Sequence, residues 1–233
     1  DDTVQEAIDA GLAFVKGIGK YPLECASSPG FVVNRVLAPY MAEAMHLAED
    51  GVPLATIDRC AEDFGMPMGP VELVDSVGID VALHVSKVLG AAFDRPVPAR
   101  LAGMVAKKQL GRKSGQGFYT WRDGKAVKPD VRDQPDAAER RRIQDRLLLP
   151  LVNEAVACLS EGVVGDGDLL DVGLELESIV LQIHVDQVDG LAPVLVDEDF
   201  RDRVLDVALD GAAQRPRARG RLDVGPAQQP VLG

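Results

Sequence analysis

Apolar residues recur every three or four positions over most of residues 1–171, and this spacing predicts a mainly helical, all-α chain. Glycine and proline residues divide the pattern into segments of helical length. Two of these segments contain an internal proline, which removes a backbone donor and is expected to kink the helix. The predicted helices cover residues 4–18, 30–50, 55–64, 70–93 with a break at Gly78, 100–110 and 137–161.

Two short segments depart from the helical pattern. Residues 118–121 are typical of a strand, Asp123-Gly124 is a hairpin signal, and residues 126–128 form the expected return strand. A weaker strand pattern covers residues 21–25. Residues 129–136 are polar and contain two prolines, which predicts a linker before the last helix.

The last predicted helix repeats the second one at an offset of 111 residues. Residues 33–52 and 144–163 are identical at seven of twenty aligned positions. The identities place a mid-helix proline (Pro39 and Pro150), a glutamate and a terminal glycine in one register. Helical amphipathicity alone rarely aligns all three, so we interpret the pair as an internal duplication. The alternative is chance similarity between two amphipathic helices.

The net charge and the cysteine content indicate which partners and which cellular compartment fit this chain. The chain has 25 Lys and Arg against 37 Asp and Glu, a net charge of -12, which argues against nucleic acid or an anionic membrane as the main partner. No apolar run approaches the ~18 residues of a membrane span, and the charged first twenty residues contain no secretory signal. Three cysteines without a C-x-x-C motif favour a reducing, cytoplasmic compartment. The chain does not begin with Met, so it is either a processed product or part of a longer protein.

The sequence contains no self-contained catalytic motif. The Gly-x-Gly triplets at Gly17, Gly115 and Gly165 do not continue into the G-x-G-x-x-G turn that cradles a pyrophosphate. P-loop, metalloprotease and nucleophile-elbow motifs are also missing, and the three histidines lack metal-ligand neighbours. The residues therefore predict neither a nucleotide-cofactor site nor a metal site.

Three ordered motifs resemble those of the 3-hydroxyacyl-CoA dehydrogenases. They are Ser-Pro-Gly-Phe-Val-Val-Asn-Arg at 28–35, Pro-Met-Gly-Pro-Val-Glu-Leu-Val-Asp-Ser-Val-Gly-Ile-Asp at 67–80, and Lys-Ser-Gly-Gln-Gly-Phe-Tyr at 113–119. The resemblance implies the all-helical C-terminal part of such an enzyme, ending in a short hairpin. The N-terminal Rossmann domain, which in that family binds NAD and carries the catalytic His and Glu, has no counterpart in this sequence.

The resemblance also implies a domain organisation. Residues 1–26 look like a remnant crossover from the missing cofactor domain, residues 27–128 like the first helical C-terminal domain, and residues 129–136 link it to a second, degenerate copy at 137–233. Such a second copy occurs in the large α subunit of the fatty-acid oxidation complex. Beyond Asp171 the sequence departs from the family, and its end is expected to be disordered. We interpret this tail as either divergent or frame-shifted, and favour the second.

Asn34 matches the family's active-site Asn, so the resemblance implies that it positions substrate. A primary amide both donates and accepts hydrogen bonds without carrying charge, which suits this role near a helix N-terminus. The alternative is an Asn that caps or bridges backbone. Ser28 is a second substrate-binding candidate, although capping of the following helix, with Pro29 at its first position, is its expected role. Arg35, Glu43 and Glu154 are expected to pack or pair rather than bind substrate.

The expected function is the substrate-side and assembly domain of an NAD-dependent 3-hydroxyacyl-CoA dehydrogenase, which converts 3-hydroxyacyl-CoA to 3-oxoacyl-CoA in fatty-acid β-oxidation. NAD would bind to the complete enzyme and not to this chain alone, which is expected to be inactive. Its partners would be acyl-CoA, a separate Rossmann domain and, through an uncovered apolar patch, further copies of itself. The alternatives are a non-catalytic helical dimerisation or acyl-CoA-binding module, and a related dehydrogenase of sugar acids.

Overall fold

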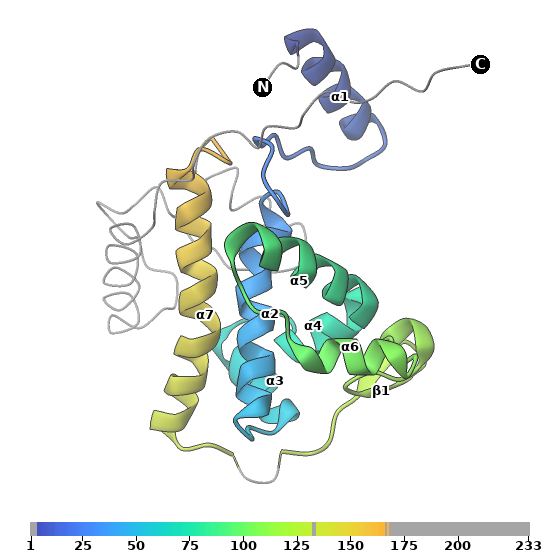
Figure 1. Ribbon diagram of the computed structural model, residues 1–233, viewed down its shortest axis with the longest axis vertical. Helices are drawn as coiled ribbons and strands as arrows, with labels where there is room; N and C mark the ends of the chain where they lie inside the picture. The colour runs from blue at the N-terminus through green and yellow to red at the C-terminus, as the bar shows by residue number, and fades with distance from the viewer. Residues whose placement is uncertain (1–3, 132–133, 166, 168–233) are drawn as a thin grey trace, which may run out of the picture.

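The computed structural model describes residues 4–131, 134–165 and 167, and these residues form a mainly helical fold (Figure 1). The predicted all-α class and its short hairpin are confirmed. The disordered end predicted beyond Asp171 lies outside the described residues. The helices are α1 (Gln5–Gly17), α2 (Val33–Glu49), α3 (Leu54–Phe64), α4 (Pro70–Val77), α5 (Ile79–Phe93), α6 (Ala99–Ala106) and α7 (Ala137–Ser160).

The long helices α2 and α7 lie side by side and run in opposite directions (Figure 1). Each contains its proline, Pro39 or Pro150, and continues past it as one helix. Both helices contribute fully buried side chains to a single core, because their apolar residues follow the helical period. The largest of these include Tyr40, Met45 and Leu47 from α2 and Ile143, Leu147, Leu148 and Leu151 from α7.

The helices α3, α4 and α5 pack against α2 and complete the core. α3 and α4 contact each other and α2, and α5 contacts α6 (Figure 1). Gly78, with φ of 105°, divides α4 from α5 as its position in the sequence predicts. Among the described residues no single helix is long and apolar enough to cross a membrane. α4 and α5 reach that length and composition only when joined, and the pair bends by 101°.

The hairpin and its supporting turn follow α6. A 3-10 turn, η1 (Arg112–Ser114), leads into two antiparallel strands, β1 (Thr120–Arg122) and β2 (Lys125–Val127). The turn between the strands is Asp123-Gly124, and both residues have positive φ, as that hairpin signal requires. The strands begin and end one or two residues away from the predicted bounds.

Several local predictions from the sequence are wrong. Residues 21–25 form no strand. α2 begins at Val33 rather than Gly30, because Gly30 and Phe31 both have positive φ and form a turn before the helix. α6 ends at Ala106 instead of continuing to Leu110, and Lys108 just beyond it has a φ of 56°.

α1 stands apart from the helical core, at one end of the molecule (Figure 1). None of its residues is buried, although it has an apolar side. Phe14 is 68% exposed and Ile18, just after the helix, is 58% exposed. The core described here therefore leaves the apolar side of α1 uncovered.

Candidate functional site

The segment before α2 presents the candidate substrate residues, and we call residues 28–32 the entry turn. The Phe31 amide donates to the Ser28 carbonyl over 2.9 Å, which closes the turn. A Cβ at Gly30 would lie 2.8 Å from the Leu89 side chain of α5 and 3.2 Å from the Arg35 amide. Only glycine fits both the positive φ and this close approach, so the entry turn is packed against α5.

Asn34 is the second residue of α2 and faces away from the core, with an exposed side chain. Phe31, in the entry turn, is 60% exposed. The N-terminal end of a helix carries partial positive charge and free backbone donors. An exposed amide at this position is therefore placed to hydrogen-bond oxygen atoms of a bound molecule, while Phe31 offers an apolar surface nearby.

Ser28 does not cap α2, which corrects its predicted role. The N-cap residue is Val32, and no side chain bonds the free amides of the first turn. The Ser28 hydroxyl instead accepts a hydrogen bond from Nη1 of Arg35 over 3.2 Å. Ser28 and Asn34 thus flank one turn, and only Asn34 is exposed.

Arg35 points into the core, opposite to Asn34, and is only 2% exposed. Its Nε donates to Glu154 over 2.7 Å and its Nη2 to Glu161 over 2.8 Å, and its guanidinium lies 4.6 Å from the centre of the Phe93 ring. Burial acts to lower the pKa of Arg35, but the hydrogen bonds to the two carboxylates outweigh it and raise the pKa. The structure therefore gives Arg35 a pairing role between α2 and α7.

A second set of ion pairs joins the same two helices at their other end. Arg146 of α7 bonds Glu43 over 3.1 Å and Asp50 over 2.6 Å. The hydrogen bond from Arg146 lowers the pKa of Asp50. Adding 111 to Arg35, Glu43 and Asp50 gives Arg146, Glu154 and Glu161. Each arginine thus pairs with the carboxylates of the other helix, in the register of the predicted duplication.

Two buried aspartates organise the hairpin, and sequence reasoning missed both. Asp75 of α4 accepts hydrogen bonds from the amides of Phe118 and Tyr119 and from the indole of Trp121, over 2.9–3.0 Å. Asp58 of α3 accepts from the Val71 amide at the start of α4 and from the Tyr119 hydroxyl. The sequence signal that could have identified them is an aspartate on the apolar face of a predicted helix, since a buried carboxylate needs hydrogen-bond partners.

Asp58 and Lys128 form a polar cluster beneath the hairpin. Burial raises the pKa of Asp58 to about 6, and the nearby Lys128 ammonium and the Val71 amide oppose that rise. Lys128 lies 3.4 Å from Asp58 and forms closer pairs with Glu62 and Glu72, over 2.6 and 2.7 Å. The Lys128 ammonium is therefore fully engaged in holding α3, α4 and the hairpin together.

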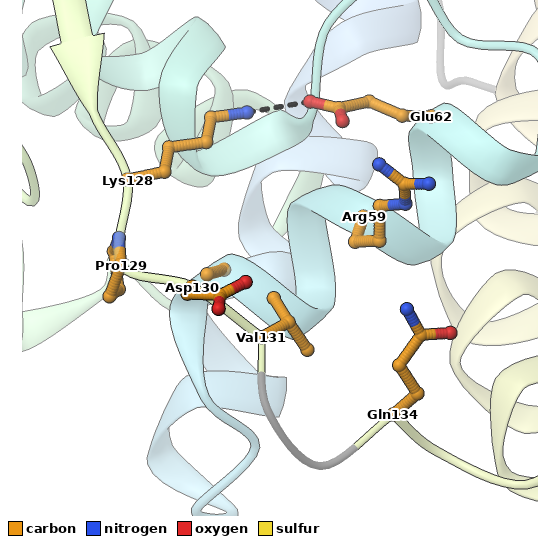
Figure 2. A pocket seen from close by; sticks show the side chains of 8 residues that line it. Arg59, Glu62, Lys128, Pro129, Asp130, Val131 and Gln134 are labelled. Carbon is orange, nitrogen blue, oxygen red and sulfur yellow. Dashed lines mark hydrogen bonds and ion pairs between the residues drawn. The ribbon is translucent and has the colours of Figure 1, made fainter.

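Two cavities lie away from Asn34. The larger, of about 430 Å³, opens between α3 and the segment after β2, with the Lys128–Glu62 ion pair at its edge (Figure 2). The other, of about 290 Å³, lies between α2, α5 and α7 and is lined by both helix prolines. Neither is lined by Ser28 or Asn34. Among the described residues, Asn34 thus lies at an exposed helix end, outside both of these cavities.

The described residues do not fit a bound dinucleotide or metal ion. Their only sheet is a two-stranded hairpin, whereas NAD is cradled by the glycine-rich turn between a parallel strand and a helix. Within residues 4–131, 134–165 and 167, no three His, Cys, Asp or Glu side chains form a group that could hold a metal ion. The chemistry available at Asn34 is hydrogen bonding and orientation of a ligand.

The fold and the site define a helical domain that offers an asparagine at the exposed end of a buried helix. A family model for the 3-hydroxyacyl-CoA dehydrogenase C-terminal domain matches residues 30–121, which include Asn34 and β1. Residues 30–121 therefore form a domain of this family. The resemblance inferred from the three motifs is confirmed.

The sequence relatives are fatty acid oxidation complex α subunits. The protein from Idiomarina loihiensis is 35% identical over 190 residues and that from Pseudomonas syringae 37% identical over 187 residues. These matches cover 75% and 73% of this chain but only 26% of each relative. The chain thus spans about a quarter of the length of the relatives it matches.

The fold also resembles a solved dehydrogenase. The structure of 3-hydroxybutyryl-CoA dehydrogenase from Escherichia coli K12 superposes with a TM-score of 0.60 at 23% identity, over 76% of this chain and 56% of that one. At this identity the likeness supports the fold and carries no conclusion about substrate. Together with the family match, it confirms the helical C-terminal domain architecture.

Proposed function

We propose that this chain is the substrate-side and assembly domain of an NAD-dependent 3-hydroxyacyl-CoA dehydrogenase of fatty-acid β-oxidation. The observation that carries the proposal is the exposed Asn34 at the N-terminal end of α2, within the residues that match the family. In the complete enzyme, a bound NAD would supply the oxidising power that converts a 3-hydroxyacyl-CoA to a 3-oxoacyl-CoA, and a base would take the hydroxyl proton. The base and the cofactor would come from a Rossmann domain.

The role of Asn34 is to orient oxygen atoms of the acyl-CoA. Its amide nitrogen donates and its amide oxygen accepts, so it can bond a hydroxyl before the reaction and a carbonyl after it. The free amides of the first turn of α2 add donors on the same side. Positioning of this kind lowers the barrier by holding reacting groups in one geometry. Ser28, bonded to Arg35, supports the turn and is the weaker substrate-binding candidate.

Reconstitution tests this function. The chain is mixed with a separately produced Rossmann domain of a fatty acid oxidation α subunit. NADH oxidation with acetoacetyl-CoA is then measured for each protein alone and for the mixture, at the same protein concentrations. We expect turnover only in the mixture. Asn34→Ala should lower kcat/KM roughly 100-fold, as loss of one preorganised donor does.

The matched control is Asn153→Ala, because Asn153 is the other asparagine of the chain and lines the cavity between α2, α5 and α7 instead of the exposed start of α2. It should leave kcat/KM within about twofold of the wild type. A mixture without turnover that still binds acyl-CoA or self-associates would overturn the dehydrogenase proposal in favour of a binding or dimerisation module. The exposed apolar side of α1 is the feature that favours this second candidate.

A further inference from the structure

Hydrogen bonds attach the residues on both sides of the entry turn to the C-terminal part of α7 and the residues just after it. The Ala26 amide, two residues before the turn, donates to the Val163 carbonyl over 2.8 Å. Arg35, three residues after the turn, bonds Glu161, the C-cap residue of α7, and Glu154, about two turns further into the helix. The segment that carries Asn34 is thus attached to α7 on both sides.

The guanidinium of Arg35 uses its three nitrogen atoms to bond the entry turn and α7. Nη1 bonds the Ser28 hydroxyl of the entry turn, and Nε and Nη2 bond Glu154 and Glu161 of α7. Glu154 is 1% exposed and also pairs with Arg95, so both of its oxygens are engaged. A buried guanidinium with a hydrogen bond from each of its three nitrogen atoms leaves its own backbone little freedom, and Asn34 is the adjacent residue.

We propose that Arg35 is a positioning residue for Asn34, and that Glu154 and Glu161 of α7 fix Arg35 in place. The proposal rests on the proposed function, because that function makes Asn34 the substrate-orienting group. α7 belongs to the segment predicted to repeat α2, so the second copy of the helix would support the site formed by the entry turn and Asn34 in the first copy. It holds the entry turn in the conformation that directs Asn34 outward.

The test compares two variants, each of which replaces one carboxylate partner of an arginine by a neutral amide. Glu161→Gln weakens the pair with Arg35, and Asp50→Asn weakens the equivalent pair with Arg146 at the far end of the same helices. Glu161 is 35% and Asp50 57% exposed, so neither change buries an unpaired charge. Both variants should therefore fold.

Hydrogen exchange on the 233-residue chain gives the first measurement. The amides of Ala26 and Phe31 are hydrogen-bonded in the wild type and report on the attachment of the turn. Glu161→Gln should speed their exchange about tenfold, the effect of losing one charged hydrogen bond, while Asp50→Asn should leave it unchanged. Unchanged exchange in Glu161→Gln, or an equal increase in both variants, would overturn the proposal.

A double-mutant cycle gives the second measurement, in the reconstituted mixture. Glu161→Gln should lower kcat/KM for acetoacetyl-CoA about tenfold, but should have no further effect in a chain that already carries Asn34→Ala. Additive losses would assign Glu161 a general structural role and contradict the proposal. If the wild-type mixture shows no turnover, the proposed function fails, while hydrogen exchange still decides whether α7 holds the turn.

Discussion

Asn34 and Arg35 are neighbours in sequence with opposite surroundings, and the pair illustrates what sequence reasoning reaches. Asn34 could be singled out because it stands within a recognisable motif. The partners of Arg35 lie 119 and 126 residues away, so no local pattern identifies them. Only the 111-residue repeat brings those arginines and carboxylates into one register, and it does not say which pairs form.

Asp75 offers a sharp test at the residue scale. Asp75→Ala would leave three buried donors, on Phe118, Tyr119 and Trp121, without an acceptor. We expect the free energy of unfolding to fall by about 3–5 kcal/mol, measured by urea unfolding with the fluorescence of the single tryptophan. Asp63→Asn, which weakens a partly exposed pair with Arg59, should change it by less than about 1 kcal/mol.

The buried Asp58 gives the stability a pH dependence of defined sign. Its pKa rises from 3.8 in the unfolded chain to about 6 in the fold, so protonation favours the folded state. This contribution is complete below about pH 4 and is lost as the pH rises through about 6. We expect the free energy of unfolding of the wild type, minus that of Asp58→Asn, to decrease over this range.

Chemical unfolding of both proteins at several pH values measures that difference. A difference that increases with pH would contradict the expectation. It would mean that Lys128 and the backbone donors keep Asp58 ionised more strongly than burial disfavours its charge.

At the scale of elements, helices were predictable and their ends were less so. The predicted ends of the second, third and last helices are correct, because Gly51, Gly65 and Gly162 adopt positive φ there. The start of α2 was missed because Phe31 also adopts positive φ, which its side chain does not favour and the sequence does not signal. The strand at 21–25 was wrong because its short apolar run has no neighbouring strand with which to pair in the part of the chain that the structure describes.

Close packing of the hairpin on α4 predicts opposite outcomes for two glycine substitutions. A Cβ at Gly117 would lie 2.2 Å from Oδ1 of Asp75, so Gly117→Ala should destabilise the fold by about 2 kcal/mol or more. Gly103 of α6 has no atom within 4 Å of the same position. Gly103→Ala should therefore stabilise the helix by about 0.5–1 kcal/mol. Thermal unfolding compares the two, and equal effects would contradict this account of the packing.

At the scale of the whole molecule, the apolar side chains left outside the core predict association. Phe14, Tyr21 and Phe31 are each at least 60% exposed. We expect the chain to self-associate through α1 and the entry turn, which sedimentation over a range of concentrations detects. Phe14→Asp should weaken the association about tenfold or more, because burial of one aromatic side chain contributes on this order.

Val127→Asp is the control for this prediction, since Val127 is 48% exposed on β2, outside α1 and the entry turn. It should change the association by less than about twofold. A wild-type chain that stays monomeric at tens of micromolar would contradict the expected homo-oligomer.

The antiparallel pairing of α2 with α7 has a consequence for the order of events during synthesis. The residues joined by the Arg35–Glu154 bond are separated by 119 positions. At the usual ribosomal rate of about 5–20 residues per second, α2 waits roughly 6–24 s for its partner helix to be made. During that interval the apolar face of α2 is open to chaperones and to neighbouring nascent chains, so slower translation of the segment between the helices should raise the yield of misassembled protein.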